Sequence, residues 1–302
     1  MKPSAATGAQ RTRSILRHLH PMSPSAGTAA PWRHDFLSHI DTMDEPSFVL
    51  STLHRVPSSS ASKFPGDDRD ALVPRSRTVI FRGLWASLPA NPRNPAPLNP
   101  AGAFETDLPT ITTDARMEKV PDLLHSTAGD AETGEGECQA SSGRGGPIEA
   151  VFWMPKVRTQ WRIRGHAYVI GPDIDTPAAA PVRTALQAHM RPGTGADSWS
   201  WSRELTAHFG NLSPLMRGTF RNPSSGTPLT GHPPGEGEGL GQRVEDLEDE
   251  LARRNFRVVV LVPEEADRVD LTDPERGRRW NYRLDQGFEG DKAGWRVTEL
   301  WP

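Results

Sequence analysis

Positively charged side chains at two places in the chain have the types and spacing of an anion-binding site. Arg77 and Arg82 lie five residues apart in an apolar stretch, so on a regular strand without a bulge they face opposite sides. Arg116 and Lys119 lie three apart in a candidate helical turn, where they share a face, and Thr113 precedes that turn. A planar arginine fork, an ammonium group and a hydroxyl together suit a phosphate group. These residue types alone leave open whether the cations bind a ligand or are solvated.

Other familiar signatures of chemistry are absent from the sequence. It contains no G-x-G-x-x-G or G-x-x-x-x-G-K-[ST] loop, no H-E-x-x-H zinc motif and no G-x-S-x-G nucleophile motif. The only cysteine, Cys138, lies in a segment rich in Gly, Ser and Glu, so an intrachain disulfide and a cysteine zinc site are excluded. We therefore expect no metal site and no thiol nucleophile.

Composition narrows the class of protein further. The 302 residues are 35% hydrophobic and 24% charged, enough for a core, while Gly 27 and Pro 29 imply long loops. With a formal net charge of -3 and no clustered basic face we expect no nucleic-acid partner, and without a run of 18 apolar residues we expect no membrane segment. A single cysteine favours a reducing compartment, hence a cytoplasmic location. Residues 1–29 form an expected disordered basic leader, with an organellar transit peptide as the alternative.

Strands dominate the expected secondary structure. Helices are expected at 35–43, 183–190, 200–209 and 244–254, and three stretches rich in Pro, Gly or Asn, at 86–108, 126–147 and 222–241, are expected loop insertions. Because strands do not alternate with helices, a mostly antiparallel barrel with peripheral helices is favoured over a doubly wound parallel sheet. The apolar, β-branched stretches that predict strands are 48–53, 78–85, 110–113, 148–153, 161–170, 256–262, 280–284 and 295–300.

Five segments, taken in order, resemble the FMN-binding split barrels related to pyridoxamine 5'-phosphate oxidase, and look closest to the flavin oxidases of that group. They are APWRHDF (30–36), SRTVIFRGLW (76–85), TITTDARMEK (110–119), TQWRIRGHAYVIG (159–171) and the block that runs from FRVVVLVP to WRVTELWP (256–302). The resemblance implies a mostly β fold, an antiparallel split β-barrel of Greek-key type, as one domain over residues 30–302. It also implies non-covalently bound FMN and a homodimer that holds the cofactor between two subunits.

The resemblance assigns cofactor contacts to the positions that match the family's motifs. The R-T-V-x-x-R strand would run beside the flavin, the T-[ND]-x-x-S-x-K turn would bind its phosphate, and the glutamine of QWRIRG would reach the ribityl chain or ring edge. A serine from the neighbouring subunit and a C-terminal arginine would complete the set, with Arg278 and Arg279 both open for the last position. The expected cofactor-binding residues are Arg77, Thr78, Val79, Arg82, Thr113, Arg116, Lys119, Gln160, Ser213 and Arg279.

Three departures from the family's pattern bear on the substrate. Met117 replaces the serine of the phosphate turn, ERGRRW (275–280) replaces the R-x-H substrate motif, and Leu271 lies near the place of an expected tryptophan. The substrate and any general acid or base therefore stay open, with Arg82 as the candidate to stabilise a reduced flavin. Three functions remain: an FMN-dependent oxidoreductase, a flavin-binding module without turnover, and a degenerate barrel that binds no flavin and serves in protein interactions.

Overall fold

The structure is a computed structural model of the whole chain, and it describes residues 28–56, 71–125, 142–230, 233–285 and 294–302. Residues 1–27 of the expected leader lie outside these ranges, as do residues 126–141 of one expected loop insertion, with Cys138. Within the described part, no helix is long and apolar enough to cross a membrane.

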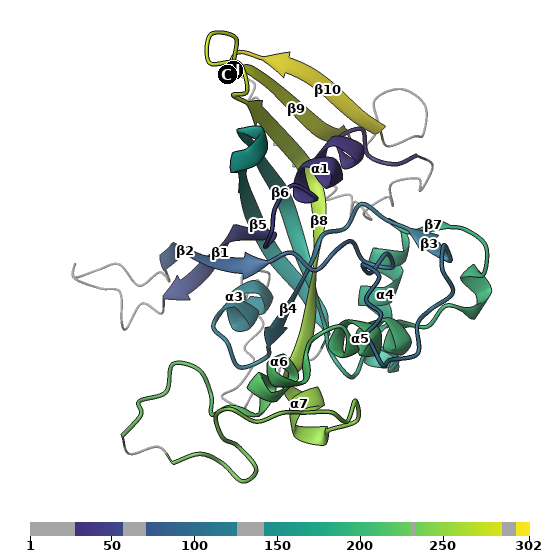
Figure 1. Cartoon of the computed structure of the whole chain (residues 1–302), viewed down its shortest axis with the longest axis vertical. Helices are drawn as coiled ribbons and strands as arrows, with labels where there is room; N and C mark the ends of the chain where they lie inside the picture. The colour runs from purple at the N-terminus through teal and green to yellow at the C-terminus, as the bar shows by residue number, and fades with distance from the viewer. Residues whose placement is uncertain (1–27, 57–70, 126–141, 231–232, 286–293) are drawn as a thin grey trace, which may run out of the picture.

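One large antiparallel sheet forms the frame of the molecule (Figure 1). Its eight strands run in the order β10-β9-β8-β6-β5-β1-β2, with β4 paired to β8 beside that path, and a separate two-stranded sheet joins β3 to β7. The expected mostly β, antiparallel fold is thereby confirmed. The strands are β1 (Ser47–Val56), β2 (Ala71–Ile80), β3 (Phe104–Glu105), β4 (Thr110–Asp114), β5 (Gly143–Met154), β6 (Thr159–Ile170), β7 (Arg191–Pro192), β8 (Phe256–Asp270), β9 (Arg278–Asp285) and β10 (Gly294–Leu300).

The sheet curls into a barrel that is split between β2 and β4. The strand expected at 78–85 ends its regular pairing at Ile80, and the chain continues past β4 as an irregular segment. The Arg82 backbone N–H donates to Thr110 O at 2.9 Å, and the Thr110 N–H donates to Gly83 O at 2.9 Å. Gly83 has φ +99, and a Cβ there would meet Pro89 at 2.5 Å, so only glycine suits this turn. A few isolated backbone bonds thus replace a regular ladder at the split.

Strand β8 separates two apolar cores, and this explains its continuous run of valines. Val259 and Leu261 face the barrel interior, where they join a cluster that contains Phe36, Phe152 and Trp161. The alternate residues Val258, Val260 and Val262 face a second cluster beneath the helices. A strand that is buried on both faces has no polar face, so its sequence shows no alternation. In the barrel interior, Phe36 meets Phe152 edge to face, with ring centroids 5.0 Å apart.

Short helices pack around the barrel, most of them on the side of the second core (Figure 1). The helix expected at 244–254 is shorter than predicted, because the Asp249 side chain accepts from the Ala252 N–H and caps a helix that starts only at Glu250. Pro121 is accommodated in the first turn of its helix, where its missing N–H is not needed. The helices are α1 (Arg33–Ile40), α3 (Lys119–His125), α4 (Ala180–Gln187), α5 (Trp201–Gly210), α6 (Pro214–Gly218) and α7 (Glu250–Asn255), with 3-10 turns η1 (Pro155–Val157), η2 (Pro177–Ala179), η3 (Ala196–Ser198) and η4 (Thr219–Arg221).

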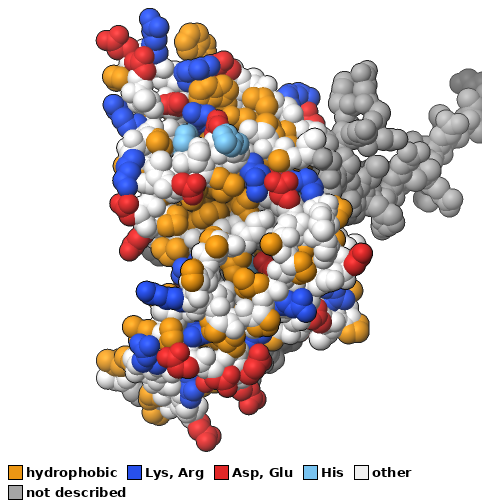
Figure 2. All heavy atoms as spheres, turned by 45° about the vertical axis from the view of Figure 1, so that its right-hand side comes forward, with side chains coloured by type: hydrophobic (Ala, Val, Ile, Leu, Met, Phe, Trp, Pro, Cys, Tyr) orange, Lys and Arg blue, Asp and Glu red, His pale blue; other side chains and the backbone are white. Residues whose placement is uncertain are grey.

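The face shown in Figure 2 carries a band of apolar side chains across its middle. Above and below this band, lysine and arginine side chains are mixed with acidic ones.

Candidate functional site

Three of the expected cofactor residues come together where β2, β4 and α3 meet. The Lys119 Nζ, in the first turn of α3, donates to Thr113 Oγ1 of β4 at 3.0 Å. Arg77 of β2 reaches toward the same helix, where its Nη2 donates to Asp122 Oδ2 at 2.9 Å. We call Arg77, Thr113 and Lys119 the cation cluster. Its members come from three segments that only the folded barrel brings together.

The cation cluster carries positive charge that the protein does not fully neutralise. Burial lowers the pKa of the Lys119 ammonium group, and the nearby charge of Arg77 lowers it further, while Asp114 and Asp122 act in the opposite direction. Its nitrogen has the Thr113 hydroxyl and the Met117 thioether, at 3.0 Å each, as hydrogen-bond acceptors. No carboxylate of the described residues forms an ion pair with Lys119. A half-buried ammonium group beside a guanidinium is the arrangement expected of an anion site.

Arg116 is directed elsewhere, although it lies only three residues before Lys119. Helix α3 begins at Lys119, so Arg116 lies in the preceding turn and the two side chains do not share a helical face. Its guanidinium donates to Asp114 at 2.7 and 2.9 Å and to Glu238 at 2.8 Å. It also donates to the carbonyl of Asn222 at 2.9 Å. Hydrogen bonding to Asp114 raises the pKa of Arg116, so this cation is held within the protein.

Arg82 presents the opposite case at the split of the barrel. Its backbone pairs with β4, and its half-buried side chain forms no hydrogen bond or ion pair with any described residue. The Nε atom is buried without an acceptor. Burial lowers the pKa of its guanidinium, and its charge contributes to lowering the pKa of the buried His208 to about 3, after burial itself. The Arg82 guanidinium therefore has hydrogen-bond donors that no described residue accepts.

Other expected residues lie on the open face of the sheet, which is the face turned away from the barrel interior. Gln160 of β6 lies directly opposite Trp153 on one side and Val269 on the other, and Val269 lies opposite Arg279. Residues opposite one another in an antiparallel ladder share a face, so these four form one row. Within this row, Arg279 donates to Asp267 at 3.0 Å, a carboxylate that Arg162 also contacts.

Adjacent residues on a strand alternate between faces, and this divides the remaining expected residues. Thr78 lies opposite Val49, on the open face, whereas its neighbours Arg77 and Val79 point to the barrel side. Arg278 points away from Arg279 and pairs with Glu299 at 3.0 Å.

Ser213 belongs neither to the cation cluster nor to the residues on the open face, because it caps a helix. Its hydroxyl accepts from the Met216 N–H at 3.2 Å at the start of α6.

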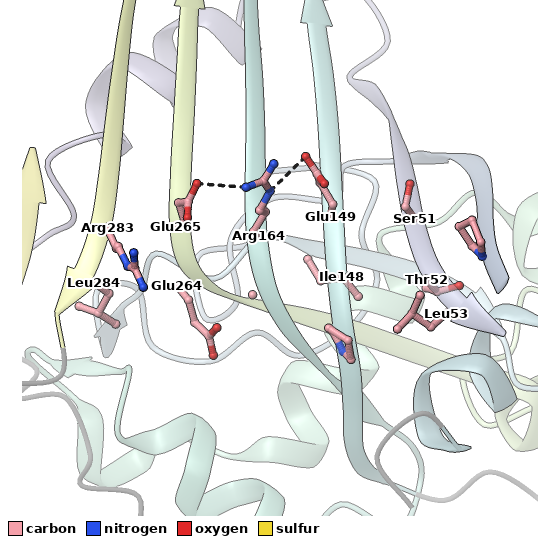
Figure 3. A pocket seen from close by; sticks show the side chains of 13 residues that line it. Ser51, Thr52, Leu53, Ile148, Glu149, Arg164, Glu264, Glu265, Arg283 and Leu284 are labelled. Carbon is pink, nitrogen blue, oxygen red and sulfur yellow. Dashed lines mark hydrogen bonds and ion pairs between the residues drawn. The ribbon is translucent and has the colours of Figure 1, made fainter. Parts of the chain in front are cut away.

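A cavity of about 690 Å³ opens on the same open face, over the middle of β5, β6 and β8 (Figure 3). Arg164 lies between Glu149 and Glu265 across its floor and pairs with them at 3.3 and 3.4 Å. Arg283 and Glu264 project beside this row. The cavity holds cations and anions in alternation, and no residue of the cation cluster lines it.

Sequence reasoning missed the residues that support Arg77. Thr52 and His54 of β1 and Asp122 of α3 surround its guanidinium or its partner carboxylate. The position of Asp122, three residues after Lys119, was the one available signal, since it predicts a shared helical face. The two β1 residues come close only through the pairing of β1 with β2.

Residues 29–171 match the family model described as pyridoxamine 5'-phosphate oxidase, FMN-binding domain. No curated protein matches the chain. Among solved structures, a pyridoxamine 5'-phosphate oxidase-related, FMN binding protein from Nostoc punctiforme PCC 73102 is 19% identical, with 91% of this chain and 99% of that chain covered and a TM-score of 0.48.

Two further solved structures are more distant. PhzG from Burkholderia lata 383, solved in complex with tetrahydrophenazine-1-carboxylic acid, is 14% identical, with 92% and 100% of the two chains covered and a TM-score of 0.40. General Stress Protein 26 from Bacillus anthracis str. Sterne is 11% identical, with 76% and 91% covered and a TM-score of 0.28.

The fold and the matched domain together define an FMN-binding split barrel. Residues 29–171 match the FMN-binding domain of the pyridoxamine 5'-phosphate oxidase family, and this match supports FMN as the cofactor.

Proposed function

We propose that this protein is an FMN-dependent oxidoreductase and that the cation cluster binds the terminal phosphate of FMN. The observation that carries the assignment is the charge balance of the cluster. Lys119 has a hydroxyl and a thioether as acceptors and a pKa lowered by burial and by Arg77, so a phosphate would relieve its unfavourable environment. Two cations and the Thr113 hydroxyl suit the oxygens of a phosphate monoester.

Arg82 supplies the proposed contact near the reacting part of the cofactor. FMN, when bound, supplies the redox chemistry, since its isoalloxazine ring accepts and releases electrons. The Arg82 guanidinium is half-buried and has no protein acceptor among the described residues, so its charge is available to a negative group. A preorganised cation in a partly desolvated site stabilises developing negative charge at little reorganisation cost. We assign Arg82 this role.

We further propose that the working unit is a homodimer. Arg77 points to the barrel side of the sheet, whereas Gln160 and Arg279 lie on the open face. One chain offers these two groups to opposite sides, so a flavin that contacts both needs the open face of a second copy. The open face also exposes apolar side chains, with Trp153 48% and Val49 40% exposed. Apolar area of this kind is what a subunit interface buries.

Turnover is tested on the purified, FMN-loaded protein. The bound flavin is reduced by light in the absence of oxygen with EDTA as the electron donor, oxygen is then admitted, and the return of flavin absorbance is followed. The oxidised protein is next mixed with phosphorylated vitamin B6 amines and alcohols, and bleaching of the flavin is measured. Bleaching by a substrate followed by oxygen-dependent recovery supports the oxidoreductase. A flavin that stays oxidised with every compound and does not reoxidise faster than free FMN supports a flavin-binding module instead.

The dimer has its own test. Light scattering of the loaded protein is expected to give twice the mass of the chain, and Trp153→Glu is expected to shift it to the monomer. Trp301→Glu is the matched control, because Trp301 is 92% exposed but lies after β10, at the sheet edge. A monomeric wild type, or dissociation by both substitutions alike, contradicts the assignment of the interface.

A further inference from the structure

We propose that Asp122 and His54 form a second layer of the phosphate site, in which Asp122 positions Arg77 and protonation of His54 strengthens the binding of the phosphate. The proposal rests on the function proposed above, because it concerns the same cation cluster. It adds two residues, and a pH dependence, that the family resemblance does not assign.

Asp122 has the contacts of a positioning residue. Its side chain is 2% exposed, yet both of its oxygens are used. Oδ2 accepts from Arg77 Nη2 at 2.9 Å and from Thr52 Oγ1 at 3.1 Å, and Thr52 in turn accepts from Arg77 Nη1 at 2.6 Å. Two adjacent donors of Arg77 are thereby fixed by α3 and β1 together. A buried carboxylate that holds a guanidinium fork at two points restricts where the rest of that fork can point.

His54 contacts the other oxygen of the same carboxylate. Its Nδ1 lies 2.7 Å from Asp122 Oδ1, and 35% of the His54 side chain is exposed. A carboxylate only accepts, so Nδ1 carries the hydrogen and protonation takes place at the other ring nitrogen. The imidazole can therefore gain a charge without losing its contact with Asp122. The charged group that His54 contacts is Asp122 on α3. Arg77 on β2 and Lys119 on α3 interact with the same carboxylate, and Arg55 follows His54 on β1.

The sign of the effect follows from the charges. Asp122 stands between Arg77 and His54, and its negative charge opposes an approaching phosphate while it orients Arg77. An imidazolium beside Asp122 offsets that negative charge and leaves Arg77 in place. Phosphate binding is then stronger when His54 carries its positive charge than when it is neutral. Riboflavin lacks the phosphate and should not respond.

The test compares FMN with riboflavin on the purified full-length protein. Dissociation constants of both are measured by flavin fluorescence from pH 5.5 to 8.5 for the wild type, for His54→Gln and for the control His34→Gln, whose histidine is exposed on α1. The phosphate of FMN itself titrates near pH 6, and the comparison with the variant removes that contribution. Relative to His54→Gln, the wild type should gain about threefold in its preference for FMN over riboflavin at the acid end, the size expected of one partly screened charge. His34→Gln should match the wild type.

Parallel curves for the wild type and His54→Gln overturn the inference but leave the phosphate assignment in place. A wild type that binds FMN no more tightly than riboflavin at every pH overturns the phosphate assignment itself, and this inference with it. A second measurement does not depend on the variant folding. By thermodynamic reciprocity, FMN must raise the pH midpoint at which the His54 ring titrates in the NMR spectrum of the wild type, and riboflavin must leave it unchanged. An unchanged midpoint with FMN bound contradicts the proposal.

Discussion

Lys119 of the cation cluster and Arg116 are close in sequence, but the protein neutralises their positive charges to different extents. Lys119 has a hydroxyl and a thioether as acceptors, whereas Arg116 is held by carboxylates from Asp114 and Glu238. We call Arg116, Asp114 and Glu238 the Arg116 network. The spacing of residues 116 and 119 suggests one site. The contacts instead separate a cation that is open to a ligand from one that is already neutralised.

The two cations also respond oppositely to their surroundings. Hydrogen bonding to Asp114 raises the pKa of Arg116, whereas burial and the charge of Arg77 lower the pKa of Lys119. A cation that is paired with carboxylates of the protein contributes to the stability of the fold. A buried cation that has few acceptors in the protein is available to bind a negatively charged ligand. Removing cations from each region and measuring both cofactor affinity and stability tests this difference.

The largest effect is expected from removing both cations of the cluster. Arg77→Ala combined with Lys119→Ala should weaken FMN binding about 100-fold or more, because each charge-assisted hydrogen bond to phosphate contributes about 1.5–3 kcal/mol. The double variant also leaves the buried Asp122 without its arginine, so its free energy of unfolding should fall by about 2–4 kcal/mol and affinities are measured where it is folded. Riboflavin binding should change little, since it has no phosphate. The measurement is the dissociation constant of each flavin by fluorescence quenching. An equal loss for both flavins would show that the substitutions disturb the fold and not a phosphate contact.

Removal of Arg116 should affect stability instead. Arg116→Ala leaves Asp114, which is 6% exposed, without its main counter-ion, so the free energy of unfolding should fall by about 2–4 kcal/mol. FMN affinity should stay within about threefold of wild type, because the guanidinium is already used within the protein. The matched variant is Lys119→Ala, which breaks no ion pair among the described residues and should cost about 1 kcal/mol or less in urea unfolding. A large loss of FMN affinity in Arg116→Ala would place this residue in the phosphate site after all.

The sequence predicted the strands and helices of the molecule better than the partners of its charged side chains. Stretches such as 48–53 and 256–262 become strands because their β-branched residues pack into cores that any barrel of this kind must bury. The strand predicted at 78–85 forms only in part, since Gly83 with its positive φ turns the chain at the split. The helix predicted at 244–254 is longer than the observed one, because apolar periodicity does not reveal that Asp249 caps the start of the helix.

Within the site, the sequence identified cations but not their partners. Thr113 and Lys119 are near in sequence, so a local turn motif was enough to link them. Glu238 lies 122 residues from Arg116 in a Gly-rich loop, and no local pattern connects the two. The support of Arg77 by Asp122 and Thr52 depends on which residues of β1 and β2 lie opposite each other, and a one-residue slip would reverse the faces.

A smaller effect is expected from the hydroxyl of the cluster. Thr113→Val keeps the size and the β-branched shape but removes one of the two acceptors of Lys119 and a donor for the phosphate. FMN affinity should fall about fivefold, the value of one hydrogen bond near 1 kcal/mol, while riboflavin affinity stays constant. The matched control is Thr112→Val, one residue earlier on β4, where the side chain points to the other face. Equal responses of the two variants would remove the hydroxyl from the site.

The last expected effect is a loss of FMN affinity at alkaline pH. The pKa of Lys119 in the free protein is lowered from its usual value near 10.5, and a bound phosphate favours the charged ammonium group and raises that pKa again. FMN affinity should therefore decline as pH rises through the lowered pKa, whereas the stability of the free protein gains over the same window, because the unfolded chain still binds the proton there. For one proton the decline cannot exceed about tenfold per pH unit. Titrations of FMN against riboflavin between pH 8 and 10 measure it, and Lys119→Arg, whose guanidinium keeps its charge, should abolish it. If the decline persists in Lys119→Arg, the alkaline response belongs to another group and Lys119 loses its assigned contact with the phosphate.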